Sequence, residues 1–399
     1  MNTARKVAIV AGPEAGHAFP AFSLAQRCAA EQIHATVFTG PNWYSVAAAR
    51  GIDIVELPAL RASDTDNDLD AGDKLSNRAA RMAVQLAPIL ASRGIDLVVG
   101  DVITVAGGWA AELCAMPYVE LSPHPLYLPS RGLPPVGAGL APGSGVRGRL
   151  RDIAMRTASN RSVALGLRQR AAARTSIGLS ALAPAPSARL VATLPALEVW
   201  RPDWPADTHI VGPLLWEPTD ETFDRPSGVG PLVVVAPSTA VTGAADMLTE
   251  SLRALGRIVT KIPVRVVISS LRPIPRELLA QVGLDAAISG SARQDEVLAD
   301  ADLVVCGAGH GMLAKSLLAG VPVVTVPGGG DQWELANRVR RQGSGLLVRP
   351  VTTAALQEAI ETVLADPAYR SAAQAAGASV ADVVDPVRVM RRVSDTVTA

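Results

Sequence analysis

The chain has 399 residues, a length that favours two domains of about 200 residues each over a single domain. Lys plus Arg and Asp plus Glu both number 37, so the formal net charge of zero excludes a general electrostatic attraction to nucleic acid or to an anionic membrane. Hydrophobic residues make up 49%, enough for large cores with buried parallel strands, and three cysteines without a close partner favour reduced thiols in the cytoplasm.

The first quarter of the chain alternates strands and helices. Residues 7–11 are an apolar run with the length of a strand, too short for a signal peptide, and no later run approaches the roughly 18 residues of a membrane span. Further strands are expected at 35–39, 52–57 and 95–99. The turn at 12–20, which contains Gly16, His17 and Pro20, follows the first strand. Such a turn at the carboxyl edge of a sheet is where α/β proteins bind ligands.

Carboxylates recur at every second position in 64–73, a pattern that invites a metal interpretation. The run does not fit a calcium loop because, counted from Asp66, the required glycine falls on Ala71 and the closing glutamate on Asn77. It also does not end a hydrophobic strand, as a metal-binding Asp-x-Asp usually does. A solvated surface loop is the favoured interpretation.

Asp101 follows the strand at 95–99 and precedes an Ala-rich helix at 106–114. The side chain therefore lies at the same sheet edge as His17, where it can also cap the helix. Another strand is expected near 116–119.

The middle of the chain is first loop-like and then helical. Residues 129–145 are rich in Pro and Gly, and 147–174 has a helical pattern with eight arginines against few acids. A solvated or interdomain face is the default interpretation, and contact with an anionic or membrane-held partner is the alternative.

The second half repeats the α/β alternation after a linker at 217–230 that is rich in Pro, Gly and charge. Strands are expected at 232–236, 264–269, 287–289, 303–306, 321–326 and 346–348. Helices are expected at 244–257, between Met312 and Gly320, before Gly343, at 352–366 and at 385–396. The pattern predicts a second, mostly parallel sheet.

The turn Gly307-Ala308-Gly309-His310-Gly311 has the features of an anion site. The first amides of the following helix lack intrahelical partners, and glycines allow a phosphate or diphosphate to approach the backbone. The alternative is a tight turn without a ligand. A dinucleotide fingerprint fits less well because GxGxxG requires Gly or Ala at Met312 and an acidic residue where Thr325 and Val326 stand.

These residues carry a resemblance to GT-B glycosyltransferases, in particular to the UDP-glycosyltransferase family that includes plant enzymes and actinobacterial natural-product enzymes. The matching donor-site positions, in order and spacing, are Gly320-Val321-Pro322, Pro327, Asp331-Gln332 and Asn337. Gly16-His17-x-x-Pro20 resembles the family's N-terminal motif, and Gly-Pro-Leu at 212–214 resembles the end of its first domain.

The resemblance implies an α/β fold of the GT-B type, in which two Rossmann-like domains face each other across a cleft. The expected units are an acceptor-binding domain at 1–212, a linker at 213–230, a nucleotide-sugar-binding domain at 231–384 and a helix at 385–399 that returns to the first domain.

The family motifs also imply site residues. His17 corresponds to the general base that deprotonates the acceptor hydroxyl, and Asp101 corresponds to the carboxylate that orients the imidazole. His124 is the second choice for the base and, with Ser122, could line the acceptor pocket. The donor nucleotide and diphosphate are expected to bind at Ser238, Thr239, Arg293, Gln294, Gly307, Ala308, Gly309, His310 and Gly311, and the sugar hydroxyls at Asp331 and Gln332.

Two positions depart from the family pattern. Gly307 stands where a histidine contacts the diphosphate, and Lys315 stands where a glutamate holds the ribose. The turn resembles the same element of the N-acetylglucosaminyltransferase that builds lipid II, which also lacks the histidine. His310 or Lys315 is a candidate source of the missing positive charge. These departures leave two alternatives open: a catalytically silent GT-B protein that binds nucleotide sugars or acts as an auxiliary partner, and a nucleotide-sugar epimerase or hydrolase.

The resulting hypothesis is an inverting, metal-independent glycosyltransferase of the cytoplasm that uses a UDP or TDP sugar and a small, hydrophobic acceptor. Helix amides would stabilise the leaving diphosphate, so no metal or other cofactor is required. No nucleic-acid partner is expected, and 147–174 offers a possible contact with a membrane surface. The donor sugar, the acceptor and the oligomeric state are left open.

Overall fold

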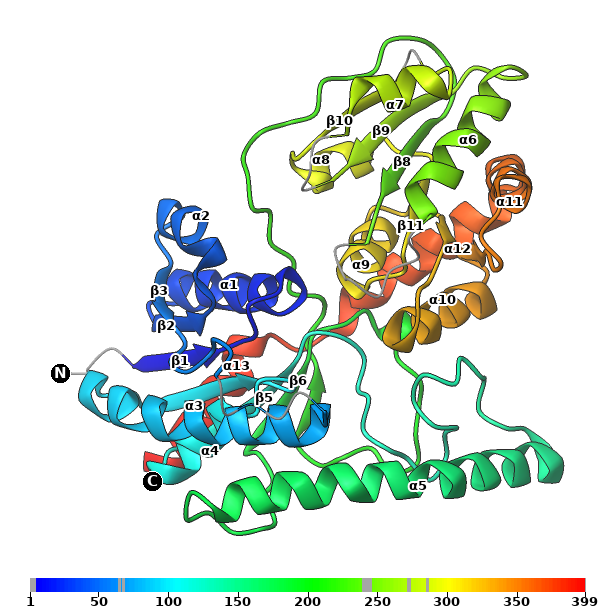
Figure 1. The fold of residues 1–399 in the computed structure, drawn as a ribbon. Coiled ribbons are helices and arrows are strands. Elements are labelled where there is room, and N and C mark those ends of the chain that lie inside the picture. Colours follow the sequence, from blue (N-terminus) through cyan, green and yellow to red (C-terminus); the bar gives the residue numbers. More distant parts are fainter. Residues whose placement is uncertain are drawn as a thin grey trace.

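The computed structural model describes residues 5–63, 66, 69–238, 246–270, 274–284 and 287–398. Two α/β units follow one another along the chain, and Figure 1 shows them as separate bodies joined by the linker and by the last helix. Thr239, one of the predicted donor-site residues, lies outside the described residues.

The first unit is a parallel sheet of seven described strands in the order β3-β2-β1-β4-β5-β6-β7. The strands are β1 Lys6–Val10, β2 His34–Thr39, β3 Asp53–Glu56, β4 Leu97–Asp101, β5 Tyr118–Ser122, β6 Ala188–Val191 and β7 Thr208–Ile210. The helices are α1 Ala15–Ala30, α2 Tyr44–Ala49, α3 Ala71–Arg93, α4 Ala106–Leu113 and α5 Gly145–Thr175.

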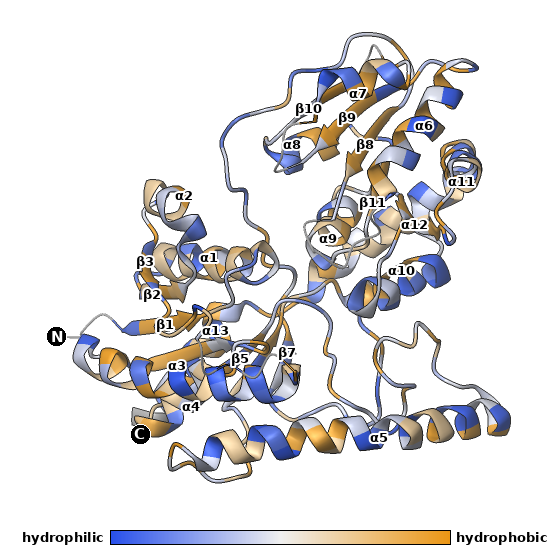
Figure 2. Cartoon of the chain, viewed as in Figure 1, coloured by the Kyte–Doolittle hydropathy of each residue, from blue (hydrophilic) through white to orange (hydrophobic). Residues whose placement is uncertain are grey.

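Alternate residues of the central strand β1 pack on opposite faces of this sheet. Val7 and Ile9 belong to a core with α1 and the last helix, α13 (Pro386–Thr398). Ala8 and Val10 belong to a second core with α3 and α4. Because both faces are covered, the strands are almost continuously hydrophobic, as Figure 2 shows.

The second unit is a parallel sheet of six described strands in the order β10-β9-β8-β11-β12-β13. The strands are β8 Leu232–Ala236, β9 Arg265–Ser269, β10 Ala287–Gly290, β11 Leu303–Cys306, β12 Val323–Thr325 and β13 Gly345–Leu347. The helices are α6 Met247–Val259, α7 Arg276–Gln281, α8 Gln294–Ala299, α9 His310–Leu318, α10 Gly330–Gln342, α11 Thr353–Ala365 and α12 Pro367–Ala378. Helices α8, α9, α10 and α12 cover one face, and α6, α7 and α11 cover the other.

Both sheets contain the Rossmann strand order 3-2-1-4-5-6, which confirms the predicted GT-B class of two Rossmann-like domains. Strand order reverses between β1 and β4 in the first sheet and between β8 and β11 in the second. Ligands of open α/β sheets bind at such switch points, outside the carboxyl ends of the strands. The domain boundaries at 212, 230 and 384 stay a prediction, although α13 packs on the first sheet through Val387, Met390 and Val393.

Several elements were not predicted from the sequence. They are β6, β7, α2, α3, α7, α8 and α12. The expected solvated loop at 64–73 also differs in its described part. Asp66 is buried in ion pairs with Arg78 and Arg81, and Asp70 caps α3 by accepting from the amides of Gly72 and Asp73.

Candidate active site

The first switch point brings His17 and Asp101 together. His17 lies in the first turn of α1, directly after β1, and Asp101 is the last residue of the neighbouring strand β4. His17 Nδ1 is 2.8 Å from Asp101 Oδ2, and the two side chains are 17% and 1% exposed. The other carboxylate oxygen accepts from the amide of Ile103 at 3.2 Å. The aspartate is therefore fixed by the backbone and holds the imidazole by Nδ1, which leaves Nε2 available.

The electrostatic environment of His17 is set by burial and by nearby carboxylates. Burial lowers the pKa of His17, but the contact with Asp101 and the negative charges of Asp101, Glu14 and Asp331 outweigh burial and raise the pKa above its ordinary value. Asp331 lies in the first turn of α10 in the second domain. Its negative charge acts on His17 across the boundary between the two domains.

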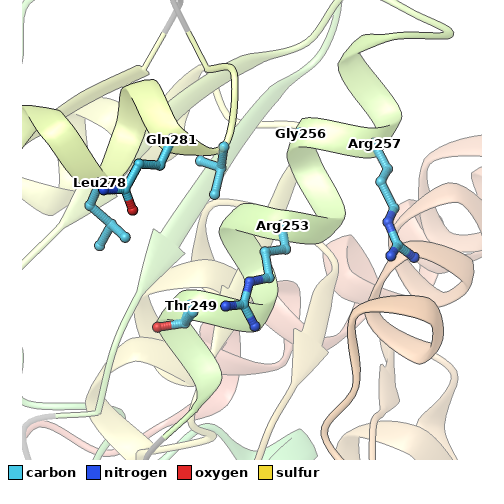
Figure 3. Close-up of a pocket in the computed structure, with 7 residues that line it drawn as sticks. Thr249, Arg253, Gly256, Arg257, Leu278 and Gln281 are labelled. Atoms are coloured by element: carbon cyan, nitrogen blue, oxygen red, sulfur yellow. The ribbon is translucent and has the colours of Figure 1, made fainter.

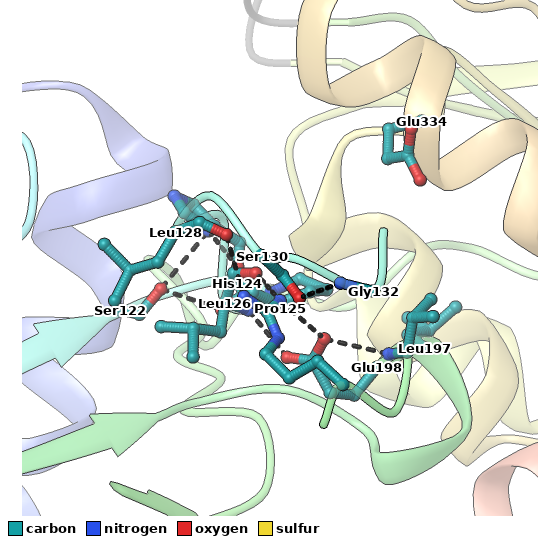
Figure 4. A network of polar contacts seen from close by, with 12 residues as sticks. Ser122, His124, Pro125, Leu126, Leu128, Ser130, Gly132, Leu197, Glu198 and Glu334 are labelled. Carbon is teal, nitrogen blue, oxygen red and sulfur yellow. Dashed lines mark hydrogen bonds and ion pairs between the residues drawn. The ribbon is translucent and has the colours of Figure 1, made fainter. Parts of the chain in front are cut away.

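The loop after β5 forms the next wall of this site. His124 Nδ1 is 2.8 Å from the carbonyl oxygen of Pro125 and 3.3 Å from Ser122 Oγ, and the His124 ring stacks on Tyr127 with the centroids 4.5 Å apart. Burial lowers the pKa of His124, and the positive charge of protonated His17 lowers it further. Figure 4 shows this network continuing through Leu126 to Glu198. His124 and Ser122 thus lie at the end of β5, where the charge of His17 acts on His124, and their place in an acceptor pocket stays a prediction.

Backbone groups at the ends of two neighbouring strands form the second switch point. Ser238 follows β8, and the turn 307–309 follows β11. A Cβ atom on Gly307 would lie 2.9 Å from Ser238 Cβ, so the serine leaves no room for the histidine that the family has at this position. A Cβ atom on Gly309 or Gly311 would meet no other atom within 4 Å. Open space therefore lies beside the first amides of α9, where an anion can approach.

His310, the first residue of α9, does not supply the missing positive charge. Its Nε2 lies 2.9 Å from Oγ1 of Thr193, a fully buried residue of the first domain. Burial lowers the pKa of His310 to about 3, so the imidazole is neutral near pH 7. Its role in the structure is a contact between the domains.

The two residues predicted to bind sugar hydroxyls lie in different environments. Asp331 is exposed. Gln332 is 4% exposed, donates to Ser238 Oγ at 2.9 Å and accepts from the amide of Gly328 at 3.0 Å. Gln332 therefore ties the loop before α10 to the end of β8, and Asp331 is the residue of the pair that is open to a ligand.

Arg293, Gln294 and Lys315 form a second group at this edge. Lys315 Nζ lies 2.6 Å from Oε1 of Glu217 and 2.9 Å from Oε1 of Gln294, and Arg293 pairs with Asp295. Lys315 is thus already paired within the protein. Glu217, a linker residue that sequence analysis did not single out, is the partner that accounts for this lysine.

A further contact missed by sequence analysis joins the loop after β5 to α10. Glu334 accepts from the amide of Gly139 at 2.9 Å, and Arg341 donates to the carbonyl oxygen of Gly139 at 2.8 Å. Gly139 has φ +68°, and a Cβ atom there would lie 2.4 Å from Nε1 of Trp333. These contacts, for which residue 139 must be a glycine, hold α10 and therefore Asp331 against the first domain.

A separate surface pocket lies between α6 and α7. Thr249, Arg253 and Gln281 are among the residues that line it, and Figure 3 shows both arginines of α6, Arg253 and Arg257, at its border. None of the predicted site residues lines this pocket. Within the described part of the chain, no group of three His, Cys, Asp or Glu side chains is arranged to hold a metal ion.

The chain is similar in sequence to known proteins. Residues 265–395 match the family model described as Erythromycin biosynthesis protein CIII-like, C-terminal domain. The 4'-demethylrebeccamycin synthase of Lentzea aerocolonigenes is 28% identical over 310 residues, which cover 73% of this chain and 72% of that protein.

Solved structures share the fold over the whole chain. The glycotransferase of kitacinnamycin superposes with a TM-score of 0.75 at 19% identity, covering 99% of this chain and 98% of that one. The glycosyltransferase VinC in complex with dTDP superposes with a TM-score of 0.70 at 18% identity, covering 98% of this chain and 100% of that one.

Proposed function

We propose that this GT-B chain is a glycosyltransferase in the family of the actinobacterial natural-product enzymes and that it carries out an inverting, single-step transfer. The donor is a nucleoside-diphosphate sugar, and the acceptor is a hydroxyl group of a small, hydrophobic molecule. The observation that carries the proposal is the His17–Asp101 pair at 2.8 Å, at the sheet edge that faces Asp331 of the second domain.

In this reaction His17 is the general base. With Nδ1 held by Asp101, the neutral imidazole accepts the acceptor proton at Nε2. The acceptor oxygen attacks the anomeric carbon as the bond to the diphosphate breaks, and the electron pair of that bond leaves with the diphosphate. Attack from the side opposite the leaving group inverts the configuration. Asp101 stabilises the imidazolium that forms.

The second domain holds the leaving group. The amides at the start of α9 and the open space at Gly309 and Gly311 suit the diphosphate, and Asp331 can accept hydrogen bonds from the sugar hydroxyls. A thymidine or uridine diphosphate is the proposed donor carrier; VinC binds dTDP. Because backbone amides can stabilise the developing charge, we propose that no metal is needed, and that activity persists in excess chelator.

Two features bear on where the enzyme works. No helix of the described residues is long and apolar enough to cross a membrane. The three cysteines are unpaired, which supports the proposed cytoplasmic location. Arginines are spread along the exposed helix α5 together with exposed apolar side chains such as Val146 and Leu150, and Figure 2 shows both kinds interleaved. Contact of α5 with a membrane surface or a membrane-held acceptor stays a proposal, to be measured by sedimentation with anionic vesicles.

The relatives do not favour the silent-protein or epimerase alternatives, since several of them are named rhamnosyltransferase or glycosyltransferase. The test of the proposed mechanism is His17→Ala, assayed with TDP- and UDP-sugars against a panel of phenols. We expect a loss of transfer of about a thousandfold, within the range for removal of a general base, with unchanged nucleotide binding.

His34→Ala is the matched control because His34 lies in the same domain at the start of β2, at the opposite edge of the sheet. It should leave the transfer rate unchanged. Substantial residual turnover in His17→Ala would contradict the assignment of His17 as the base.

A further inference from the structure

The linker after β7 is held by both domains on alternate residues. Leu214 and Trp216 are buried in the core of the first domain, and the Trp216 ring packs on Phe19 and Phe22 of α1 with centroids 5.1 Å and 4.9 Å apart. Arg50 stacks over Trp216 and donates to the carbonyl oxygen of Pro218 and to Asp220. These contacts lie on one side of the extended segment.

The intervening residues contact the second domain. Leu215 packs on the core beneath α9 and α10, and Glu217 reaches Lys315. The carbonyl oxygen of Glu221 accepts from the amide of Arg293 at 2.7 Å. An extended chain directs successive side chains to opposite sides, so residues 214–221 act as a two-sided strap rather than as a free tether. Figure 1 shows this segment leaving the first domain beside α1.

Glu217 is the central polar contact of the strap. Its two carboxylate oxygens accept from the amides of Gln294 and Asp295 at 3.2 Å and 3.3 Å, which are the first amides of α8, and Oε1 also binds Lys315 Nζ at 2.6 Å. The Lys315 and Glu217 side chains are only 10% and 15% exposed. Water screens a pair so placed less than a surface pair, so reversing either charge is costly.

The strap joins the two helices that carry the proposed reaction. Trp216 packs on α1, which bears His17, and the adjacent Glu217 is paired with α9, which follows the glycine turn. We infer that Trp216 and Glu217 are positioning residues, which set the distance between the base and the donor diphosphate. This inference rests on the proposed function. It also accounts for Lys315, which serves the strap instead of holding the ribose.

A charge-reversal cycle tests the inference. Spin labels at Arg27→Cys on α1 and Ser371→Cys on α12, both exposed positions, report the interdomain distance without any substrate, in a Cys114→Ala background. Lys315→Glu and Glu217→Lys should each broaden or shift the distance distribution and lower kcat for TDP-glucose and 4-methylumbelliferone at least about tenfold. The double variant should narrow the distribution again and recover part of kcat, because opposite charges are paired once more while a lysine at position 217 cannot accept from the amides of Gln294 and Asp295.

Two further variants keep the result decisive. Lys315→Met removes the ion pair without placing like charges together and should also broaden the distribution, should a reversal fail to fold. Lys261→Glu breaks the exposed pair with Glu361 at 3.1 Å within the second domain and should change neither readout.

An unchanged distance distribution in the Lys315 and Glu217 single variants, or no recovery in the double variant, would overturn the inference. His17→Ala in the same background separates it from the proposed function. That variant should keep the wild-type distance distribution while transfer is lost. Retained transfer in His17→Ala would refute the base assignment alone.

Discussion

The two switch points lie at the boundary between the domains, but different chemical groups form each of them. The edge of the first sheet presents ionisable side chains, with His17 held by Asp101 and flanked by His124. The edge of the second presents backbone, with Gly307 pressed against Ser238 and open space at Gly309. In the proposed reaction, proton transfer and anion binding therefore fall on separate domains, and the two domains must be held in register.

The same contrast separates two histidines that both face the boundary. Asp101 and two further carboxylates raise the pKa of His17 despite its burial, whereas burial and, to a smaller extent, the positive charge of His124 lower the pKa of His310 to about 3. The negative charge around His17 therefore favours proton uptake by its imidazole, whereas burial opposes proton uptake by His310. The residue type alone does not determine the role of either one.

Asp101→Asn should have the largest effect among the variants that sharpen this contrast. Asp101 raises the pKa of His17, and only the neutral imidazole accepts a proton, so the wild-type kcat/KM rises with pH through that raised pKa. Removing the negative charge should lower the pKa of His17 and so move the rise in kcat/KM to lower pH. The value of kcat should fall about a hundredfold because the imidazole is no longer oriented. The measurement is kcat/KM from about pH 5 to about pH 9.

Thr104→Ala is the control for this pH profile. Thr104 Oγ1 lies 3.4 Å from Asp101 Oδ2, so its loss alters the neighbourhood of the carboxylate without removing charge. In this variant kcat/KM should rise at the same pH as in the wild type. If kcat/KM of Asp101→Asn rises at the same pH as that of the wild type, Asp101 is not the charge that raises the pKa of His17.

Gly309→Ala should have an intermediate effect that concerns only the donor. A Cβ atom added to Gly309 would meet nothing within 4 Å, and the φ of −62° suits any residue. We therefore expect an unchanged melting temperature. The methyl group would occupy the space proposed for the diphosphate and should raise the donor KM about tenfold, which corresponds to about 1.4 kcal/mol. The measurements are thermal unfolding and donor kinetics.

Gly307→Ala is the matched variant with the opposite signature. Its Cβ atom would lie 2.9 Å from Ser238 Cβ, so β8 and β11 must shift apart and the free energy of unfolding should fall by about 1–3 kcal/mol. Loss of stability in Gly309→Ala instead would argue that the turn is purely structural.

Much of the first switch point could be predicted from the sequence because its parts lie at the ends of obvious strands. Residues 7–11 and 95–99 are apolar runs, and the residues that follow two adjacent parallel strands meet at one edge. Strand β6 was missed because it has only four residues and contains Arg189, whose charge is paired with Glu120 of β5. The residue that balances the charge of Arg189 lies on the neighbouring strand, so the residues of β6 alone do not reveal a strand.

The contacts between the domains could not be predicted because they depend on the packing of whole domains. Glu217 and Lys315 are 98 positions apart, and no local pattern links them. The low pKa of His310 likewise depends on burial against Thr193 of the other domain, 117 positions away. Short motifs indicated which residues lie at each sheet edge, but not which charges are already paired there.

Thr193→Val should have the smallest effect on catalysis and tests the passive role of His310. The substitution keeps the shape of the side chain but removes the hydroxyl that contacts His310 Nε2, so a buried nitrogen loses its partner and the free energy of unfolding should fall by about 1–3 kcal/mol. Because His310 is neutral, the donor KM should change less than about twofold, equivalent to about 0.4 kcal/mol. Urea denaturation and donor kinetics measure the two quantities, and Thr208→Val, at a half-exposed position on β7, controls for the loss of a hydroxyl. A donor KM that rises strongly in Thr193→Val with no loss of stability would instead place His310 in direct contact with the diphosphate, and the division between the two sheet edges would then fail.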